Sequence, residues 1–428
     1  MNGTRRLKEA SRMDRPDQAQ LLNEGVVAKF LRYVQVDSPS GEGEGVPSTP
    51  EQWDMARLLE AELKALGLEE VRVDEHAIVT ATLPGNRPGA PAIGLLAHFD
   101  TFPGTPGHNV KPLVHRNYDG GEIRLPAGPV IRPEEHPALR RCIGHDIITS
   151  DGSTLLGADD KAGVAIIMEI VSRLIRNPDA PRGPIRIGFT PDEETGRGIR
   201  LFDVAAFDAT AAYTFDGSAL GEVEAENFNA RNLEVTITGK SAHTGTAKGQ
   251  MINAVALAAE FCMAIPATMR PESTQGYEGF IHVDAINGSV EEVTMKILLR
   301  DFTDEGLAHK QAIVEGLLAG LEQRHPGART ALRQTGGYRN MKAGVARDPR
   351  VLDLALEAVR DAGLEPVLKP IRGGTDGAVL TEMGLPCPNL FTGGMNYHSR
   401  TEWASAQWME KAVEVGLNLV RRWAEERA

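Results

Sequence analysis

Hydrophobic and polar positions in the first half of the chain alternate between helical and extended spacing. Residues 21–34 and 162–177 carry apolar side chains at helical spacing, which predicts amphipathic helices. A continuous apolar run at 92–97 predicts a strand that is covered on both faces, residues 185–190 predict another buried strand, and residues 211–215 predict a further strand. Strands that alternate with helices are typical of an α/β domain, so we expect a mostly parallel sheet flanked by helices.

The middle of the chain has a different pattern. Residues 233–237 alternate between apolar and polar side chains, as in a half-buried strand. Residues 251–263 and 304–324 have helical spacing, and 280–302 reads as a long hairpin that turns near Asn287 and Gly288. This order of strands and helices predicts a small α+β domain.

We therefore expect two domains and an extension. The α/β domain would comprise residues 21–227 and 340–428, and a smaller α+β domain of the lid or dimerisation type, residues 228–339, would be inserted in it. Residues 1–20 are polar and fit neither pattern, so we expect them to form a disordered N-terminal extension.

Composition restricts the partners and the compartment. The 428 residues carry a net charge of −13, which argues against nucleic acid and anionic membranes as partners, because a polyanion binds a basic surface. Cys142, Cys262 and Cys387 are odd in number and lack CxxC spacing, which favours reduced thiols. Neither a signal peptide nor an apolar run of membrane-spanning length is recognisable, so we expect a cytoplasmic protein.

The segment LLGADDKAG, residues 155–163, holds Asp159 and Asp160 between glycines where a strand passes into a helix. Ligand sites of open α/β sheets lie at such junctions. A single aspartate here would more often be an N-cap, whose oxygen accepts hydrogen bonds from the first N–H groups of the helix. Two adjacent aspartates, beside further His and Asp/Glu clusters, favour a metal site with Asp159 at its centre.

Three further polar clusters follow predicted strands. His98 and Asp100 are two positions apart, so one can bind a metal while the other orients it; a buried His–Asp hydrogen bond is the alternative. Glu193 and Glu194 repel each other unless a cation or a proton lies between them; an exposed acidic loop is the alternative. Asp216 also ends a strand, where an aspartate alone is no more than a turn former.

Together these clusters supply ligands from separate strand ends. The expected set is His98, Asp159, Glu194, Asp216 and a histidine near the C-terminus. Nitrogen and oxygen ligands of this kind suit two Zn²⁺-like ions about 3.5–4 Å apart that share one carboxylate and one water. The expected chemistry is hydrolysis.

Several motifs, in order along the chain, resemble one family. They are HFDT at 98–101, LLGADDKAG, FTPDEETG at 189–196, FDG around Asp216, HTGTAKG at 243–249, GYEGF, IRGGTDGAVLTEMGLPCPN and FTGGMNYHSRTEW. From about Val26 to the C-terminus the chain is similar to the co-catalytic zinc peptidase family that includes carboxypeptidase G and aminoacylase, and within it to tripeptide aminopeptidases. The resemblance implies the zinc aminopeptidase-like fold.

The resemblance also implies ligands and roles. Two zinc ions, for which Co²⁺ or Mn²⁺ are expected substitutes, would share Asp159: one bound by His98, Asp159 and Asp216, the other by Asp159, Glu194 and His398. Asp100 would orient His98, and Glu193 would be the general base. A cis peptide bond between Asp159 and Asp160 is also implied.

Four residues are assigned to the substrate. The resemblance suggests that His243 stabilises the oxyanion; a hairpin histidine is the alternative. Arg300 and Arg372 are assigned to the C-terminal carboxylate of a peptide, because a guanidinium binds it bidentately; either could instead form a structural ion pair. Asn253 would add a polar contact.

The expected protein is a dizinc aminopeptidase that acts on short peptides, mainly tripeptides, and that can form a homodimer. A dipeptidase, a carboxypeptidase or an N-acyl amino acid hydrolase is the alternative within the family, and a non-catalytic peptide or metal binder is the alternative outside it. Substrate length stays open, because three segments depart from the family pattern: HTGT at 243–246, Met395, and SRTEW at 399–403.

Overall fold

The computed structural model describes residues 25–427 and divides them into two compact units. Unit 1 comprises the described residues up to Val223 together with Gly344–Leu368 and those from Met383 onward, and unit 2 comprises Glu224–Ala343 and Lys369–Glu382. The extension expected at residues 1–20 lies outside the described residues.

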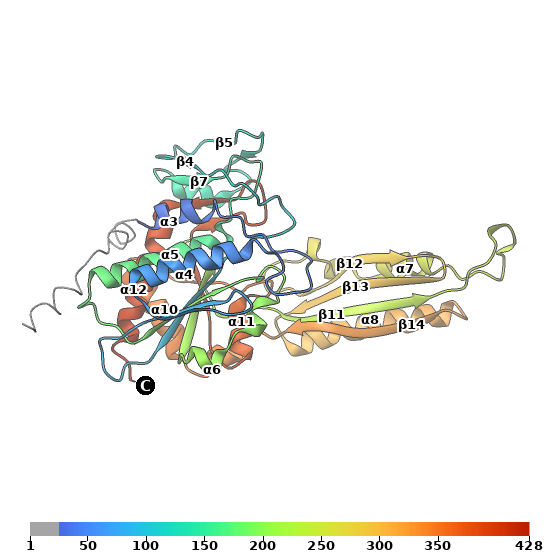
Figure 1. The fold of residues 1–428 in the computed structure, drawn as a ribbon. Helices are drawn as coiled ribbons and strands as arrows, with labels where there is room; N and C mark the ends of the chain where they lie inside the picture. Colours follow the sequence, from blue (N-terminus) through green and yellow to red (C-terminus); the bar gives the residue numbers. More distant parts are fainter. Residues whose placement is uncertain (1–24, 428) are drawn as a thin grey trace, which may run out of the picture. The chain divides into compact units, whose positions relative to one another are not determined.

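Unit 1 is built on an eight-stranded sheet (Figure 1). Strand β3 pairs in parallel with both β8 and β9, and β9 pairs in parallel with β16, whereas β1 and β2 add an antiparallel edge. The spatial order is β1 (Glu69–Val73), β2 (Val79–Leu83), β8 (Ile185–Thr190), β3 (Ile93–His98), β9 (Ala211–Gly217), β16 (Asn389–Phe391), β10 (Glu222–Glu224) and β15 (Val367–Leu368).

Helix α5 (Ala158–Arg176) is the central helix of unit 1. It packs against β3 and β9, and α3 (Val26–Tyr33) and α12 (Ala406–Trp423) pack against α5. The helix approaches the sheet closely at Gly163, where a Cβ would lie 1.9 Å from the backbone oxygen of Phe215. The other helices of unit 1 are α4 (Gln52–Leu66), η2 (Pro137–Cys142), η3 (Gly198–Leu201), α6 (Val204–Phe207) and α10 (Arg350–Asp361).

A second, smaller sheet in unit 1 joins segments that are far apart in the sequence. Its order is β17 (Gly394–Met395), β18 (Trp403–Ser405), β7 (Ile147–Thr149) and β4 (Leu113–His115), and β5 (Ile123–Arg124) pairs with β6 (Val130–Ile131) nearby in the sequence. The residues between Thr101 and Ser150 form loops and short strands with their own apolar core, which includes Tyr118, Leu139 and Trp403. This core attaches the segment after His398 to the rest of unit 1.

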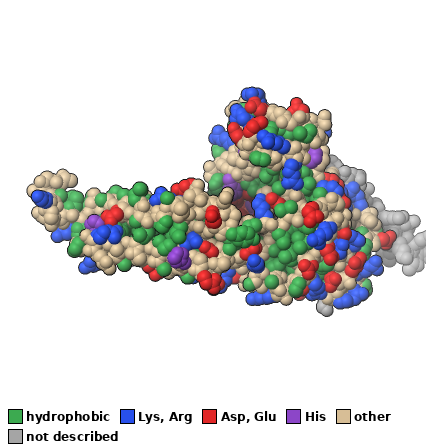
Figure 2. All heavy atoms as spheres, turned by 180° about the vertical axis from the view of Figure 1, so that it is seen from behind, with side chains coloured by type: hydrophobic (Ala, Val, Ile, Leu, Met, Phe, Trp, Pro, Cys, Tyr) green, Lys and Arg blue, Asp and Glu red, His purple; other side chains and the backbone are tan. Residues whose placement is uncertain are grey.

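On the face of unit 1 drawn in Figure 2, acidic and basic side chains are interspersed. Oppositely charged side chains of unit 1 form ion pairs, such as the one between Arg422 of α12 and Asp361 at the end of α10, at 2.7 Å. Among the described residues, no helix is long and apolar enough to cross a bilayer.

Unit 2 is a four-stranded antiparallel sheet with helices packed on it. The strand order is β12 (Phe280–Gly288), β13 (Glu292–Asp301), β11 (Asn229–Thr238) and β14 (Arg329–Tyr338). Its helices are α7 (Ala254–Ala264), η4 (Thr244–Thr246), η5 (Ala267–Met269), η6 (Pro271–Ser273), α8 (Asp304–Arg324) and α11 (Asp376–Glu382), and α9 (Lys342–Val345) lies at its boundary. Together with the mostly parallel sheet of unit 1, this antiparallel sheet confirms the predicted fold class.

Two features of unit 2 differ from the sequence pattern. Strand β14 has no clean apolar alternation, because it is an edge strand whose side chains are mostly exposed or half-buried, and only its pairing with β11 identifies it. Residues Lys369–Glu382 lie in unit 2, whereas the sequence pattern groups them with the α/β domain. Backbone pairing of Asn227 with Ile371 brings this segment to unit 2.

Candidate metal centre and active site

The polar residues predicted at strand ends come together in unit 1. His98 ends β3, Asp216 lies near the end of β9, and Glu193 and Glu194 follow β8. Asp159 lies in the first turn of α5. Because these strands are parallel neighbours, their carboxyl ends meet at one edge of the sheet, where ligand sites of α/β folds lie.

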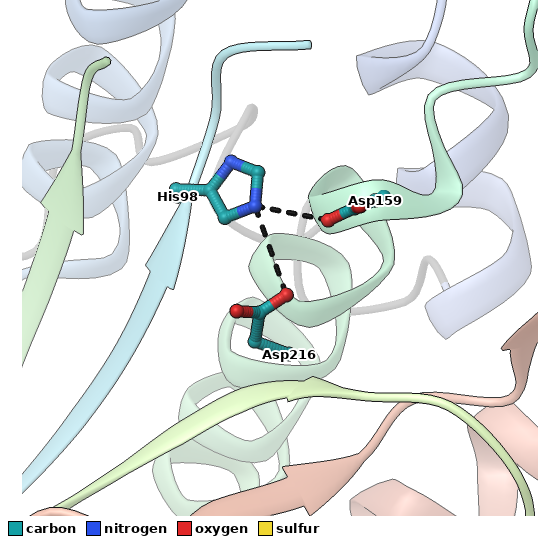
Figure 3. Close-up of side chains that lie close together, drawn as sticks. All are labelled: His98, Asp159 and Asp216. Atoms are coloured by element: carbon teal, nitrogen blue, oxygen red, sulfur yellow. Dashed lines mark hydrogen bonds and ion pairs between the residues drawn. The ribbon is translucent and has the colours of Figure 1, made fainter. Parts of the chain in front are cut away.

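One group of ligand-type atoms surrounds His98 (Figure 3). Its Nε2 lies 2.9 Å from Oδ1 of Asp159 and 3.7 Å from Oδ1 of Asp216. The His98 side chain is only 2% exposed. The two carboxylates come from α5 and β9, so three separate elements supply this group.

A second group shares Asp159 with the first. Nε2 of His398 lies 3.1 Å from Oδ2 of Asp159 and 2.9 Å from Oε1 of Glu194. In each group the ligand atoms lie within 4.8 Å of one another. The two oxygens of Asp159 therefore face the two histidines separately, which is the arrangement expected of a bridging carboxylate.

Some of the nitrogen and oxygen atoms in these two groups lack hydrogen-bond donors within the described part of the protein, and a cation would satisfy them. Nδ1 of His98 lies 3.1 Å from the backbone oxygen of Asp100 and 3.3 Å from its Oδ1, so a proton on Nδ1 is satisfied there. The Nε2 lone pair then points at carboxylate oxygens. Oε1 of Glu194 is buried and accepts no hydrogen bond although Nε2 of His398 is close, because a single N–H cannot serve both Asp159 and Glu194.

Imidazole nitrogens and carboxylate oxygens in this number are the donors that Zn²⁺ and related divalent ions take. The described residues thus contain two candidate groups, His98 with Asp159 and Asp216, and Asp159 with Glu194 and His398.

Burial and the close approach of like charges raise the proton affinity of this cluster. Burial raises the pKa of Glu194 to about 7, with a contribution from the charge of Asp159, and it raises the pKa of Asp216 to about 6. Burial alone would lower the pKa of His398, but the adjacent carboxylates of Asp159 and Glu194 raise it to about 10. A divalent cation that binds here therefore displaces protons.

Asp100 contacts the turn that carries the two glutamates as well as His98. Its Oδ1 accepts a hydrogen bond from the backbone N–H of Glu193 at 3.0 Å, and its Oδ2 accepts one from the N–H of Glu194 at 3.2 Å. The Glu193 carboxylate is 17% exposed, and its Oε2 lies 3.9 Å from Nε2 of His98. One buried carboxylate thus fixes both the imidazole and the turn that carries the two glutamates.

The turn before Glu193 is held from the other side by Asp192. Asp192 has a left-handed backbone with φ +56°, and its carboxylate accepts hydrogen bonds from the Ser48 N–H at 2.6 Å and from Nε2 of Gln52 at 2.9 Å. Oε1 of Gln52 in turn accepts a hydrogen bond from the N–H of Asp192 at 3.1 Å. The peptide bond between Asp159 and Asp160 is cis, as the resemblance implied.

Two residues of this site were missed by the sequence analysis. Glu402, 1% exposed, accepts hydrogen bonds from the N–H groups of Leu156, Gly157 and Asp159. The ring of Phe102 stacks on that of His398, with centroids 4.1 Å apart and planes 3° from parallel. The local sequence around Glu402 and Phe102 does not predict these contacts, because their partners lie about 240 to 300 positions away in the chain.

The four residues assigned to the substrate all lie in unit 2. His243 is exposed, and its Nδ1 accepts a hydrogen bond from the Gly245 N–H at 3.1 Å. Asn253 is the N-cap of α7, where its Oδ1 accepts hydrogen bonds from Val255 and Ala256. Its side-chain oxygen therefore has a structural partner.

The two arginines differ in how much of their guanidinium is engaged. Arg372 donates to the backbone oxygens of Gly276 and Glu278 and to Oγ1 of Thr274, and it lies over the Phe228 ring at 5.1 Å. Arg300 uses Nη1 for Asn232 and for the Leu299 carbonyl, and it lies over the Tyr338 ring at 5.3 Å. Both arginines therefore already have structural contacts within unit 2, and binding of a substrate would be an additional role.

A mostly parallel α/β sheet that gathers histidines and carboxylates around one shared aspartate is the architecture of a metal-dependent hydrolase. Residues 155–422 match the model of peptidase family M20/M25/M40, and the chain belongs to this family.

Within the family, its sequence relatives are called peptidase T. The chain is 46% identical to the peptidase T of Geobacillus thermodenitrificans, over 94% of this chain and 98% of that protein. It is also 46% identical to the peptidase T of Escherichia fergusonii, over 94% and 99% of the two chains. The resemblance seen in the sequence motifs is confirmed.

Solved structures support the same fold. An aminopeptidase PepT from Bacillus cereus superposes with a TM-score of 0.74 at 24% identity, covering 94% of this chain and 98% of that chain. A tripeptidase from Staphylococcus aureus superposes with the same TM-score, identity and coverage. A dinuclear metal-binding peptidase of family M20 from Bacillus subtilis superposes with a TM-score of 0.60 at 16% identity, covering 96% of this chain and 99% of that chain.

Proposed function

We propose that this peptidase is a tripeptide aminopeptidase that uses two divalent cations, with Zn²⁺ as the resident metal. The observation that carries the proposal is Asp159, whose two carboxylate oxygens face His98 and His398 on opposite sides. The names of its relatives, peptidase T and a tripeptidase, support the class of substrate. His98, Asp159 and Asp216 would hold one ion, and Asp159, Glu194 and His398 the other.

The roles of the surrounding residues follow from their positions. Two bound Zn²⁺ ions supply Lewis-acid activation of water and of the peptide carbonyl. Glu193, partly exposed beside His98, takes the proton of the attacking water on its carboxylate and returns it to the leaving amine. Asp100 keeps His98 in the tautomer that carries its proton on Nδ1, and it holds the backbone of Glu193 through a hydrogen bond.

The substrate contacts belong to the same proposal. His243, exposed on unit 2, would donate a hydrogen bond to the oxyanion, and Arg300 would bind the C-terminal carboxylate of the peptide. Arg372 and Asn253 would also contact the substrate, although their side chains already form hydrogen bonds within unit 2.

We also propose a cytoplasmic location. Its support is that Cys142, Cys262 and Cys387 are free thiols, as expected in a reducing compartment.

Three versions of one peptide test the function. Metal-loaded enzyme should hydrolyse a free tripeptide and release its N-terminal residue. N-acetylation should abolish cleavage, because an aminopeptidase requires the free α-ammonium group, and C-terminal amidation should raise KM if a guanidinium binds the carboxylate. Faster cleavage of the acetylated form would instead identify an N-acyl amino acid hydrolase, and release of the C-terminal residue a carboxypeptidase.

A dipeptide with the same N-terminal residue is the length control. A kcat/KM for the dipeptide above that for the tripeptide would identify a dipeptidase. If every peptide of the panel stays intact while the protein binds two cations, the chain is a non-catalytic metal or peptide binder.

A further inference from the structure

Glu402 is a buried carboxylate that no step of the proposed reaction uses. It lies four residues after His398 and directly before β18, and it is 1% exposed. Burial of a carboxylate is costly unless hydrogen bonds to its charged form compensate for the lost water. The partners of Glu402 therefore indicate its task.

The hydrogen bonds that the Glu402 carboxylate accepts come from the backbone turn that leads into α5. Its Oε2 accepts from the N–H of Leu156 at 2.7 Å and from the N–H of Gly157 at 2.8 Å, and its Oε1 accepts from the N–H of Asp159 at 3.0 Å. Three donors on one carboxyl group fix the direction of three peptide planes, because a hydrogen bond weakens steeply as its angle departs from linear.

The turn has a conformation that its own sequence does not enforce. Gly157 is left-handed with φ +82°, and Asp159 and Asp160 have non-helical dihedral angles although they lie within the first turn of α5. The Asp159 side chain leaves the backbone between two histidines at 2.9 and 3.1 Å. A rotation of its peptide plane would move at least one carboxylate oxygen away from its histidine.

We infer that Glu402 is a positioning residue, whose carboxylate holds the Leu156–Asp159 backbone so that the Asp159 carboxylate stays between His98 and His398. No hydrogen bond or ion pair joins the Glu402 carboxylate to either histidine, so its bonded route to the metal ligands is through the backbone of Asp159. The inference rests on the proposed function in one respect, that Asp159 is a shared metal ligand.

The substitution Glu402→Gln tests this with almost no change in shape. An amide offers one oxygen and one NH₂ group, so at least one of the three backbone N–H groups then faces a donor. The affinity for Zn²⁺, measured by competition with a chromophoric chelator, should fall by about 10–100-fold, the usual cost of losing a group that orients a metal ligand. The Co²⁺-substituted protein should show an altered d–d absorption spectrum, and Glu402→Asp should have a smaller effect.

Glu169→Gln is the matched control. Glu169 is another buried glutamate, also on α5, and it pairs with Lys29 at 2.9 Å. Its substitution should lower the melting temperature and leave the Zn²⁺ affinity and the Co²⁺ spectrum unchanged. If both variants lower the metal affinity equally, Glu402 has only a general structural role, and the inference is overturned.

Hydrogen exchange gives a readout that does not require the variant to fold. In wild-type protein, peptides covering residues 155–160 should exchange slowly both with Zn²⁺ and after its removal, because Glu402 holds these amides without the metal. If protection appears only when Zn²⁺ is bound, the metal sets the turn and the inference fails.

The two proposals fail in different ways. A wild-type protein that binds no divalent cation in equilibrium dialysis overturns both of them. A wild-type protein that binds two cations, with Glu402→Gln binding them equally well, overturns the role of Glu402 alone.

Discussion

Each carboxylate of the site faces a different kind of partner. Asp159 faces two imidazoles, Asp100 holds an imidazole and two backbone N–H groups, and Glu402 holds only backbone. Glu193 is close to His98 but is partly exposed. Because these environments differ, substitutions of the individual carboxylates should separate metal binding from proton transfer.

Glu193→Gln should keep both metal ions and lose at least about a hundredfold in kcat, the lower range for removing a general base. The amide keeps the shape of the side chain but cannot accept the proton of water. Metal content is measured by mass spectrometry and turnover by stopped assay on a tripeptide. Glu75→Gln, at a side chain 87% exposed, is the control; a kcat that Glu193→Gln leaves unchanged would rule out this mechanism.

At the scale of elements, partly buried polar contacts around Asp301 join a strand end to a helix start in unit 2. Asp301, the last residue of β13, accepts hydrogen bonds from Nζ of Lys310 on α8 at 2.5 Å and from the N–H of Thr303 at 3.0 Å. Thr303 is in turn the N-cap of α8. Asp301 therefore connects the end of a strand to the start of the helix that packs on it.

This contact makes the stability of unit 2 dependent on pH. Burial alone would raise the pKa of Asp301, but the hydrogen bonds from Lys310 and Thr303 lower it below its usual value. A lowered carboxyl pKa stabilises the fold above the unfolded pKa of about 3.9, and this contribution disappears as pH falls through the folded pKa. Asp301→Asn should cost about 1–3 kcal/mol at pH 7 and progressively less below pH 4.

The measurement is hydrogen exchange of β13 peptides at pH 7 and denaturant unfolding across the acid range. Asp284→Asn on β12, whose side chain is 50% exposed, is the control and should be nearly neutral. A destabilisation by Asp301→Asn that stays the same from pH 7 to pH 3 would contradict the assigned ion pair.

At the scale of the whole molecule, the candidate metal ligands and the candidate substrate residues belong to different units. His98, Asp159, Glu194, Asp216 and His398 lie in unit 1, and His243, Asn253, Arg300 and Arg372 lie in unit 2. The proposed function thus assigns the metal-binding role to unit 1 and the substrate-binding role to unit 2. Removal of the metal should then change the stability of unit 1, and loss of substrate contacts should come from substitutions in unit 2.

Metal removal should destabilise unit 1 selectively. A ligand present at a hundred times its Kd contributes about 2.7 kcal/mol to the state that binds it. Chelation should therefore increase hydrogen exchange in β3 and in the part of α5 beyond residue 160, while β11 and β13 should be unaffected, because the described candidate ligand groups lie in unit 1. Equal loss of protection in both units would indicate that the cations bind elsewhere or that the units unfold together.

The two arginines of unit 2 should give different results. Arg300→Ala should raise KM for tripeptides with little change in melting temperature, because only Nη1 of its guanidinium donates the hydrogen bonds described above. Arg372→Ala should lower the melting temperature as well, since it removes hydrogen bonds to Thr274, Gly276 and Glu278. Unchanged kinetics in both variants would place the carboxylate pocket elsewhere.

The sequence by itself determined which residue types follow which strands. Apolar runs predicted β3, β8 and β9, and polar clusters at their ends predicted that His98, Glu194 and Asp216 would meet, because parallel strands bring their carboxyl ends to one edge. This inference needs only local pattern and one general rule of sheet geometry.

Only the tertiary structure decided which backbone groups those side chains contact. The bonds from Glu402 to Gly157 and from Asp192 to Gln52 join positions far apart in the sequence, as does the pairing that makes β14 a strand. A backbone N–H is present at almost every residue and leaves no mark in the sequence. Its partner is therefore known only once the chain has folded.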